Sequence, residues 1–340
     1  MQKQQTSFLG IDVSKLTLDV SLMHLLDHQK QDMSTQRFDN DPQGLKALHQ
    51  WLKTAGVALD ESALLVIENT GVYHRLLWQY CTTQGLPLHI GNATHIKWSF
   101  GIARGKNDRI DSQRLCLYAY RHRDELKASA VLDAVLLELK DLVRARDRLK
   151  GQSNSIKVYL QELKASNSKE VQKLLEQAHQ AALQGLIKSL EQVQRRIDEI
   201  VQTTQGIQAT YKLLLSVPGI GQVTAVYLMC CTNNFATKIS GKQLASYAGL
   251  APFEHRSGTS VKGRSRVHRM GNKTLKRLLH MGARSVVRHN AEMKEYYERK
   301  AAQGKHHMHI LNAIKNKMVL RVASVVNNQR AYVDKYNKAG

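Results

Sequence analysis

The stretch that decides the fold of the N-terminal region is Phe8-Leu-Gly-Ile-Asp-Val-Ser-Lys-Leu-Thr-Leu-Asp-Val-Ser-Leu22. Residues 8–13 form a short apolar run, and every second residue from 16 to 22 is then apolar. The first pattern is typical of a buried strand, and the second of a strand with one exposed face. The stretch therefore predicts two consecutive strands of a sheet.

Similar signals continue to about residue 125. A third strand is predicted near Gln36–Phe38, a central strand covered on both faces at Leu64–Ile67, and a fifth strand at Pro87–Ile90. Apolar residues at helical spacing predict a helix after each of these three strands. The order of three strands, helix, strand, helix, strand, helix predicts an α/β domain over residues 1–125.

Between residues 126 and 205 the apolar pattern becomes purely helical. Ten positions between 132 and 163 step by three and four, and the same stepping returns from 183 to 200 after a polar break at 167–169. Two such segments predict a long antiparallel helical hairpin or coiled coil, which would serve as a spacer or an oligomerisation arm. Amphipathic helices packed on their own domain are the alternative.

Residues 206–340 are predicted to form a third, mainly helical domain. It contains Ser216-Val-Pro-Gly-Ile-Gly221, which is typical of the Gly-rich turn of a helix–hairpin–helix element. Such turns direct backbone N–H groups at a phosphate, so Gly219 and Gly221 are predicted nucleic-acid contacts that do not read sequence. A purely structural turn between two helices is the alternative.

The 340-residue chain carries 50 Lys and Arg against 28 Asp and Glu, a net charge of +22. From residue 256 to 340 there are 20 basic and 4 acidic residues, so this segment holds +16 of that charge. The excess predicts a polyanionic partner. We expect phosphate contacts from the basic residues that surround and follow the segment Pro252–Gly263. These are Arg256, Lys262, Arg264, Arg266, Arg269, Lys273 and Arg277.

A membrane partner is disfavoured, because no apolar run approaches the ~18–20 residues that a bilayer span requires. The N-terminal residues also lack the hydrophobic segment of a signal peptide, so we expect a cytoplasmic protein. The four cysteines show no CxxC pairing, which favours reduced core thiols over a zinc site or a disulfide.

Four carboxylates stand at positions that suggest chemistry. Asp12 lies inside the first apolar strand, where a carboxylate needs a cation or hydrogen-bond donors, and Glu68 ends the central strand. Asp108 and Asp111 have the spacing that places both on one helical face, where like charges repel. Hard oxygen ligands favour Mg²⁺ or Mn²⁺, and two such ions could act on a phosphodiester. A turn, a helix cap and solvated surface positions are the alternative roles.

These residues carry a family resemblance. Gly10-Ile-Asp12-Val-Ser-Lys15, Ile67-Glu68-Asn-Thr-Gly71 and Asn107-Asp108-Arg-Ile-Asp111 resemble the Asp-Glu-Asp-Asp signature of RuvC-like domains in one family of bacterial insertion sequences. The family comprises the DEDD transposases, also called bridge-RNA-guided recombinases, and the related Piv-type DNA invertases. Three later segments match it in the same order: Pro218-Gly-Ile-Gly221, Leu244-Ala-Ser-Tyr-Ala-Gly-Leu-Ala-Pro252 and Ser257-Gly-Thr-Ser-Val-Lys-Gly263.

The resemblance implies an RNase H-like fold for residues 1–125, with metal ions held by Asp12, Glu68, Asp108 and Asp111. It also implies that Ser257 attacks the DNA backbone and forms a covalent phosphoserine intermediate. The residues alone predict only a polar phosphate-binding loop between Pro252 and Gly263. In that loop and just beyond it, Thr259, Ser260 and Ser265 are chemically equivalent to Ser257.

The implied function is DNA transposition, in which a structured noncoding RNA pairs with donor and target DNA and so delegates specificity to base pairing. The resemblance further implies a dimer or tetramer joined by the helical arm, in which the carboxylates and the serine meet. A Piv-type site-specific invertase is a close alternative. A hydrolytic RuvC-like nuclease without a covalent intermediate and a non-catalytic nucleic-acid scaffold are more distant ones.

Overall fold

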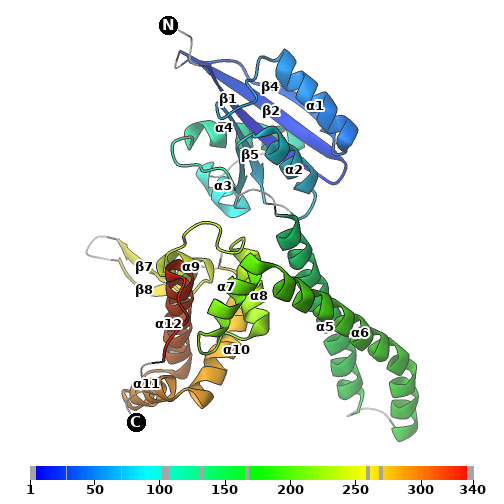
Figure 1. Cartoon of the computed structure of the whole chain (residues 1–340), viewed down its shortest axis with the longest axis vertical. Helices are drawn as coiled ribbons and strands as arrows, with labels where there is room; N and C mark the ends of the chain where they lie inside the picture. Colours follow the sequence, from blue (N-terminus) through cyan, green and yellow to red (C-terminus); the bar gives the residue numbers. More distant parts are fainter. Residues whose placement is uncertain are drawn as a thin grey trace. The chain divides into compact units, whose positions relative to one another are not determined.

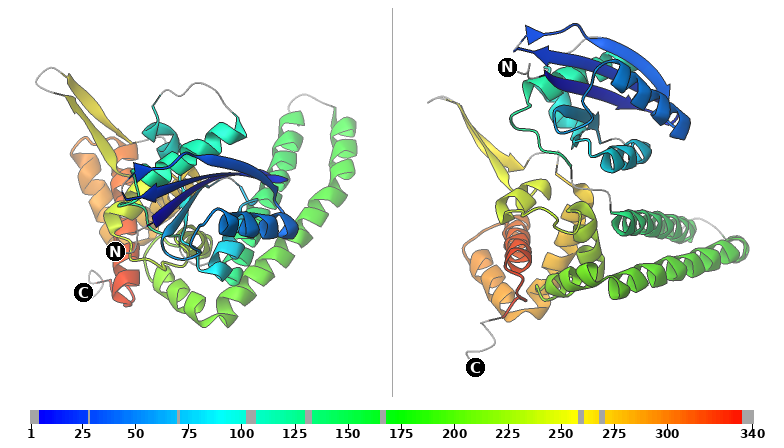
Figure 2. Two further views of the ribbon diagram at one scale, coloured as in Figure 1. Left: turned by 90° about the horizontal axis from the view of Figure 1, so that it is seen from above. Right: turned by 45° about the horizontal axis from the view of Figure 1, so that its top comes forward.

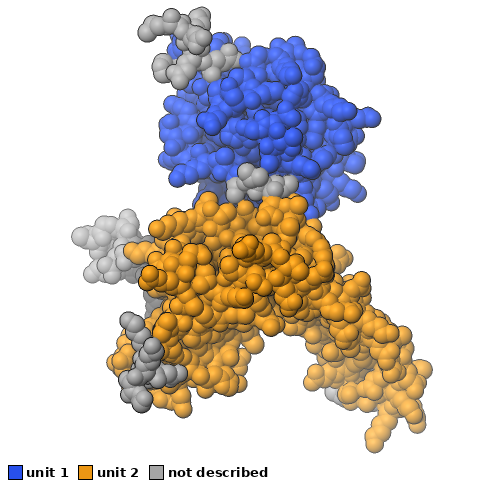
Figure 3. Space-filling model, in the orientation of Figure 1, with its two compact units in different colours: residues 1–132 blue, residues 133–340 orange. Residues whose placement is uncertain are grey.

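A computed structural model describes residues 5–27, 29–69, 71–101, 107–129, 133–164, 168–257, 261–267 and 271–334. Within these, the side chains of Gln5 and of residues 252–266 are not described. The chain divides into two compact units, residues 1–132 and residues 133–340, each of which is described by itself (Figure 3).

Unit 1 is built on one six-stranded sheet (Figure 1). Its strands are β1 (Gln5–Val13), β2 (Thr17–Leu26), β3 (Gln29–Lys30), β4 (Ser34–Asp39), β5 (Ala63–Glu68) and β6 (Leu88–Gly91). The order is β3-β2-β1-β5-β6, with β4 also paired to β2. β1, β5 and β6 run parallel, whereas β2 is antiparallel to β1 and β4 is antiparallel to β2. This mixed α/β arrangement is consistent with a RuvC-like domain, and only the two-residue β3 was not predicted.

Four helices complete unit 1, namely α1 (Pro42–Thr54), α2 (Arg75–Gln84), α3 (Ala93–Ser99) and α4 (Asp108–Arg121). Residues of α1 and α2 form one core with alternate residues of β1, β2 and β5, among them Leu9, Leu18 and Leu65. The intervening strand residues, such as Phe8 and Val66, pack with α3 and α4 in a second core. The sheet is therefore covered on both faces, as Figure 2 shows from two further directions.

Unit 2 begins with two long helices, α5 (Ala134–Leu163) and α6 (Lys169–Thr203), which run side by side in opposite directions (Figure 1). Contacts along their length fix this pairing: Arg196 Nε lies 2.7 Å from Glu138 Oε1, and Lys164 Nζ lies 3.0 Å from Glu176 Oε1. Leu139 and Ile197, near the shared end, are buried in the core of unit 2. The distal part of the helix pair therefore extends from a well-packed base.

The remainder of unit 2 contains α7 (Gln205–Leu215), α8 (Gln222–Cys231), α9 (Gly241–Tyr247), α10 (Lys273–His289), α11 (Ala291–Ala302) and α12 (His307–Asn328). A two-stranded hairpin, β7 (Pro252–Ser257) and β8 (Val261–Val267), interrupts the helices. Helix α12 packs against α7, α9, α10 and α11. Ile314, Met318 and Val322 of α12 are fully buried, so this helix forms the centre of the core.

The structure corrects one expectation in this region. Within the segment predicted as a loop, Pro252–Gly263, residues 252–257 form β7 and residues 261–263 begin β8. Arg264 and Arg266 follow on β8, and the next helix, α10, starts at Lys273. The four cysteines are free thiols; three of them are buried and Cys231 is partly buried. Within the part of the chain that is described, no helix has the length and apolar character needed to cross a bilayer.

Candidate active site

Asp12 and Glu68 lie at the same edge of the sheet. β1 and β5 are parallel, and Ile11 pairs in register with Ile67, so the next residue of each strand is one of the two carboxylates. Both also belong to the strand face that packs against α4, because side chains alternate along a strand. The parallel register therefore brings together two acidic residues that are 56 positions apart in the sequence.

Helix α4 brings Asp108 and Asp111 to this edge. Asn107 caps the helix by accepting a hydrogen bond from the backbone N–H of Arg109, which places both aspartates in the first turn. Carboxylates there interact favourably with the positive end of the helix dipole. All four predicted carboxylates are thus presented by β1, β5 and the first turn of α4.

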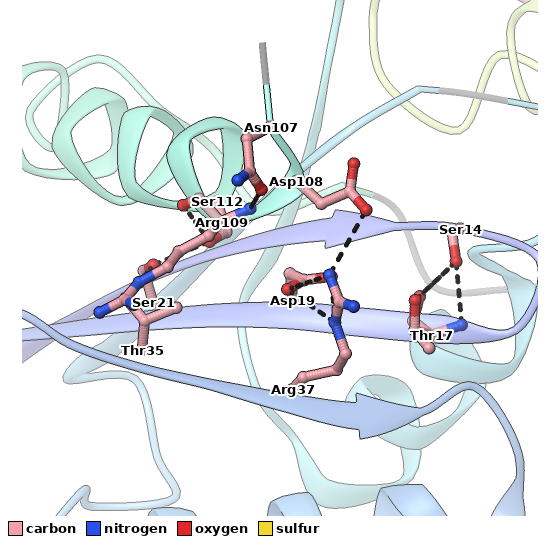
Figure 4. A network of polar contacts seen from close by, with 10 residues as sticks. All are labelled: Ser14, Thr17, Asp19, Ser21, Thr35, Arg37, Asn107, Asp108, Arg109 and Ser112. Atoms are coloured by element: carbon pink, nitrogen blue, oxygen red, sulfur yellow. Dashed lines mark hydrogen bonds and ion pairs between the residues drawn. The ribbon is translucent and has the colours of Figure 1, made fainter. Parts of the chain in front are cut away.

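Gly10 explains why α4 can approach the sheet so closely. A Cβ atom at this position would lie 2.0 Å from the backbone nitrogen of Cys116 and 2.2 Å from the carbonyl oxygen of Ser112. Ser112 is fully buried, and its hydroxyl lies 2.8 Å from that of Ser21 on β2 (Figure 4). The missing side chain and this buried hydrogen bond hold residues 112–116 of α4, which follow its first turn, against β1 two residues from Asp12.

Asp12 is the electrostatic centre of the cluster. It is half-buried, and its pKa is raised from its ordinary value of 3.8 to about 6. Burial is the largest cause, followed by repulsion from Asp108, Asp111, Asp19 and Glu68. Among the described residues, no donor or cation pairs with the Asp12 carboxylate. The fold therefore concentrates negative charge around Asp12, which has no counter-ion among the described residues.

The sequence analysis missed one carboxylate of this cluster, Asp19, together with its partner Arg37. Asp12, Asp19 and Arg37 lie side by side on β1, β2 and β4. Arg37 Nε donates to both oxygens of buried Asp19 at 3.1 and 3.2 Å, and its Nη2 lies 3.5 Å from Asp108 Oδ2 (Figure 4). The strict alternation of residues 16–22 assigned Asp19 to an exposed face, but α4 covers that face.

The donor set suits a hard divalent cation, since it consists of carboxylate oxygens with like-charge repulsion between them. As they stand, however, no three His, Cys, Asp or Glu side chains in the described ranges are close enough to hold one metal ion. Asp111 is in addition paired with Arg114 at 3.0 Å, and Asp108 with Arg37. The chemistry of the residues fits Mg²⁺ or Mn²⁺, while their side chains are engaged with arginines or spread apart.

The predicted phosphate-binding turn lies between α7 and α8. Gly219 has a left-handed backbone conformation, with φ +87°, and packs against Gly282 and Met318. It is therefore at least partly a packing residue. Gly221 is exposed at the N-cap of α8, where no side chain caps the helix. The free N-terminal turn of α8 remains available to an anion.

Ser257 is the last residue of β7 and pairs in register with Val261. The base of the hairpin is held tightly to the core, because Gly249 and Gly271 approach each other so closely that a Cβ on Gly271 would lie 2.3 Å from the Gly249 Cα. The backbone N–H of Asn272 donates to the carbonyl of Tyr247 at 2.8 Å and closes the same junction. Ser257 is thus carried by a β-hairpin with an anchored base.

The predicted basic residues fall into two groups. Lys273 and Arg277 are exposed, one turn apart at the start of α10. For the hairpin residues Arg256, Lys262, Arg264 and Arg266, as for Ser257, only the backbone is described, and Arg269 lies outside the described residues.

Two family models match the chain in the order in which these features occur. A DEDD transposase model of IS110 elements matches residues 9–164, and the model of the IS116/IS110/IS902 transposase family matches residues 211–298. The chain therefore carries transposase domains of the IS116/IS110/IS902 family. The first match contains all four predicted carboxylates, and the second contains the glycine turn and the β7–β8 hairpin.

Curated relatives of this transposase include both invertases and transposases. It is 27% identical to the pilin gene-inverting protein of Moraxella bovis, over 96% of this chain and 97% of the relative. It is 26% identical to the transposase for insertion sequence element IS1111A of Coxiella burnetii, over 60% of this chain and 61% of the relative. A shorter match, 37% identical over 99 residues, is to an IS110 protein of Streptomyces coelicolor and covers 29% of this chain and 24% of the relative.

Proposed function

We propose that this transposase cuts and rejoins donor and target DNA through a covalent link to Ser257, with Mg²⁺ or Mn²⁺ held by Asp12, Glu68, Asp108 and Asp111. The observation that carries the proposal is that β1, β5 and the first turn of α4 present these four carboxylates at one edge of the sheet. Burial, and then repulsion from the neighbouring carboxylates, raise the pKa of Asp12, and a bound cation would relieve that repulsion. A bound metal ion would stabilise negative charge on the phosphodiester.

The proposed reaction conserves the number of phosphodiester bonds. The Ser257 oxygen bonds to phosphorus while one P–O bond of the DNA breaks, and the released strand end carries the hydroxyl. A hydroxyl from the exchanged strand then attacks the phosphoserine and frees the serine. No external energy source is needed, because the covalent intermediate keeps the bond energy. Cations near the hairpin would stabilise the charge that develops on the phosphoryl group.

We further propose that a structured noncoding RNA guides the reaction, as the family resemblance implies. The residues of this chain support binding of a nucleic-acid backbone, whether DNA or RNA. Lys273, Arg277 and the open N-terminus of α8 offer contacts to nucleic-acid backbone rather than to base edges. Such contacts suit a protein that leaves sequence recognition to base pairing.

Assembly through the helical arm is part of the same proposal. The distal half of α5 and α6 exposes several large apolar side chains, including Val158, Leu174 and Ile187, which are 52%, 65% and 44% exposed. Leu160, Leu183 and Ile187 line an open groove of about 750 Å³ between the two helices. Because exposed apolar side chains gathered on an extended arm favour association, we propose that the arm joins subunits into a dimer or tetramer.

Site-specific inversion is a second candidate function. The pilin gene-inverting protein is similar over nearly the whole of both chains, so the similarity to an invertase is not confined to one unit. Both functions use the same strand exchange and differ in whether the joined sites lie on one molecule in opposite orientation. A plasmid with two inverted copies of the element's end distinguishes them, since inversion changes its restriction map and transposition moves the element elsewhere.

The proposed site is tested by a recombination assay in cells that carry the protein and the element with its native flanks. Asp12→Asn and Glu68→Gln are each expected to reduce recombinant joints at least ~100-fold, because each removes a metal ligand. Asp32→Asn, at an exposed position of the same unit, serves as the control and is expected to retain activity. Recombination by Asp12→Asn at the level of Asp32→Asn would refute the proposed metal site.

A further inference from the structure

Lys315 is a buried lysine without a counter-ion. It lies on the inner face of α12 between Leu311 and Met318, and only 3% of its surface is exposed. Among the described residues it makes no ion pair and no hydrogen bond. Burial, and then repulsion from Lys276, lower its pKa. Burying most of a lysine side chain without a counter-ion is unfavourable, so its presence in the core of unit 2 requires an explanation.

A second polar group without a partner lies next to it on α10. His280 Nδ1 is buried and has no hydrogen-bond partner. Lys276 and Arg284 stand one turn before and one turn after it, and His307 begins α12. The pKa of His280 is lowered by burial and then by Lys315, Arg284 and His307, in that order. Every charged group that acts on His280 or Lys315 is therefore basic.

This arrangement fits an anion better than it fits a structural role. A methionine at position 315 would fill the same space without the cost of a buried charge. Two helices nevertheless supply five basic side chains to one place, and the buried Nδ1 of His280 among them lacks a partner. An incoming anion would provide the missing acceptors and the missing negative charge.

We propose that Lys276, His280 and Lys315 form a phosphate-binding site between α10 and α12 that takes a backbone phosphate of a nucleic acid. This inference rests on the proposed function for the identity of the ligand, since a phosphodiester is the anion that a recombinase meets. The site contains neither the four carboxylates nor Ser257, and it holds a strand in place without reacting with it.

The proposal gives Lys315→Met two effects of opposite sign. Removal of an uncompensated buried charge is expected to leave the melting temperature of the free protein unchanged or to raise it. The same change is expected to weaken nucleic-acid binding about fivefold to tenfold and to lower the slope of log K against log salt by about one. A residue that only supports the fold would lose stability and binding together.

The experiment measures fluorescence anisotropy of the full-length protein in EDTA, with a duplex DNA and a structured RNA of equal length as probes. Lys317→Met, on the same helix, removes an equal charge from a side chain that stacks on the Tyr296 ring at 4.4 Å, and is the matched control. Lys276→Met, at the rim of the site, provides a second test that leaves the core intact. Because neither metal nor strand cleavage is involved, failure of the proposed chemistry would not affect these measurements.

Weaker binding by Lys315→Met and Lys276→Met than by Lys317→Met supports the site. The probe whose affinity decreases, DNA, RNA or both, identifies the nucleic acid that supplies the phosphate. Affinities for both probes equal to those of Lys317→Met would overturn the proposal. A lower melting temperature for Lys315→Met, with normal binding by Lys276→Met, would also overturn it, because Lys315 would then be a packing residue.

Discussion

At the scale of single residues, the candidate site depends on carboxylates that the fold holds together against their mutual repulsion. Asp19 is neutralised by Arg37, whereas Asp12 has four acidic neighbours and no cation among the described residues. Because the pKa of Asp12 in the folded protein, about 6, exceeds its ordinary value of 3.8, folding favours the protonated form. The stability contributed by this group is complete below about pH 4 and is lost as the pH rises through 6.

Asp12→Asn should therefore stabilise the metal-free protein at pH 8 and have little effect at pH 4. After allowance for solvent screening of a half-buried group, we expect a gain of about 1–2 kcal/mol at pH 8. Thermal melts in EDTA at both pH values measure this. Added Mg²⁺ should raise the melting temperature of the wild type but not that of the variant. Equal destabilisation by Asp12→Asn at both pH values would show that Asp12 has a structural role.

At the scale of secondary-structure elements, the decisive event is the docking of α4 on β1. Gly10 permits it, since the backbone of α4 occupies the space of a Cβ atom. The buried hydroxyls of Ser21 and Ser112 then fix the position of the helix. This close contact brings Asp108 and Asp111 near enough to Asp12 for their charges to raise its pKa, after the larger effect of burial.

Gly10→Ala should consequently destabilise unit 1 by about 2–4 kcal/mol, because the backbone of α4 cannot yield as a flexible side chain can. It should also weaken the Mg²⁺-induced shift in melting temperature, since the first turn of α4 moves away from Asp12. Gly185→Ala in the middle of α6 is the control, with nothing within 4 Å of the added methyl, and should stabilise slightly. A Gly10→Ala protein as stable as the wild type would contradict the proposed docking.

Comparison of individual elements shows what the sequence could predict. The period-two and apolar patterns predict five of the six strands of unit 1 along the chain, because strand burial depends mainly on local alternation, but not their order in the sheet. Asp19 was missed because alternation cannot reveal that a distant helix covers the polar face. The β7–β8 hairpin was taken for a loop because its glycines and charged residues carry little strand signal. Strand position and helical spacing pointed to the four carboxylates singly or in pairs, and the family resemblance implied one metal site, whereas Arg37 and Lys315 required the structure.

At the scale of the whole molecule, the protein has two compact units and a net charge of +22, and this charge favours binding of a large polyanion. Most of the excess positive charge lies in the last quarter of the sequence, whereas the carboxylates of the candidate site belong to unit 1. The helical arm adds exposed apolar surface to unit 2, which we assign to contacts between subunits.

Leu174→Gln should reduce the average mass of the assembly, because it removes the most exposed large apolar side chain of the arm. Sedimentation velocity at several protein concentrations measures this. The exposed Leu16 of unit 1 provides the control, since Leu16→Gln makes the same chemical change outside the arm and should leave the mass unchanged. Identical sedimentation of both variants and the wild type would exclude Leu174 from the subunit contact.

The most direct test of the central claim is to trap DNA on the protein. The transposase is expressed with its element and native flanks, denatured, and examined for covalently attached DNA, alongside Ser257→Ala and the control Ser265→Ala. The account predicts an adduct in the wild type and in Ser265→Ala that is absent from Ser257→Ala, with phosphate recovered on the peptide that contains Ser257. Cleaved DNA without any adduct in the wild type would contradict it and would indicate metal-dependent hydrolysis.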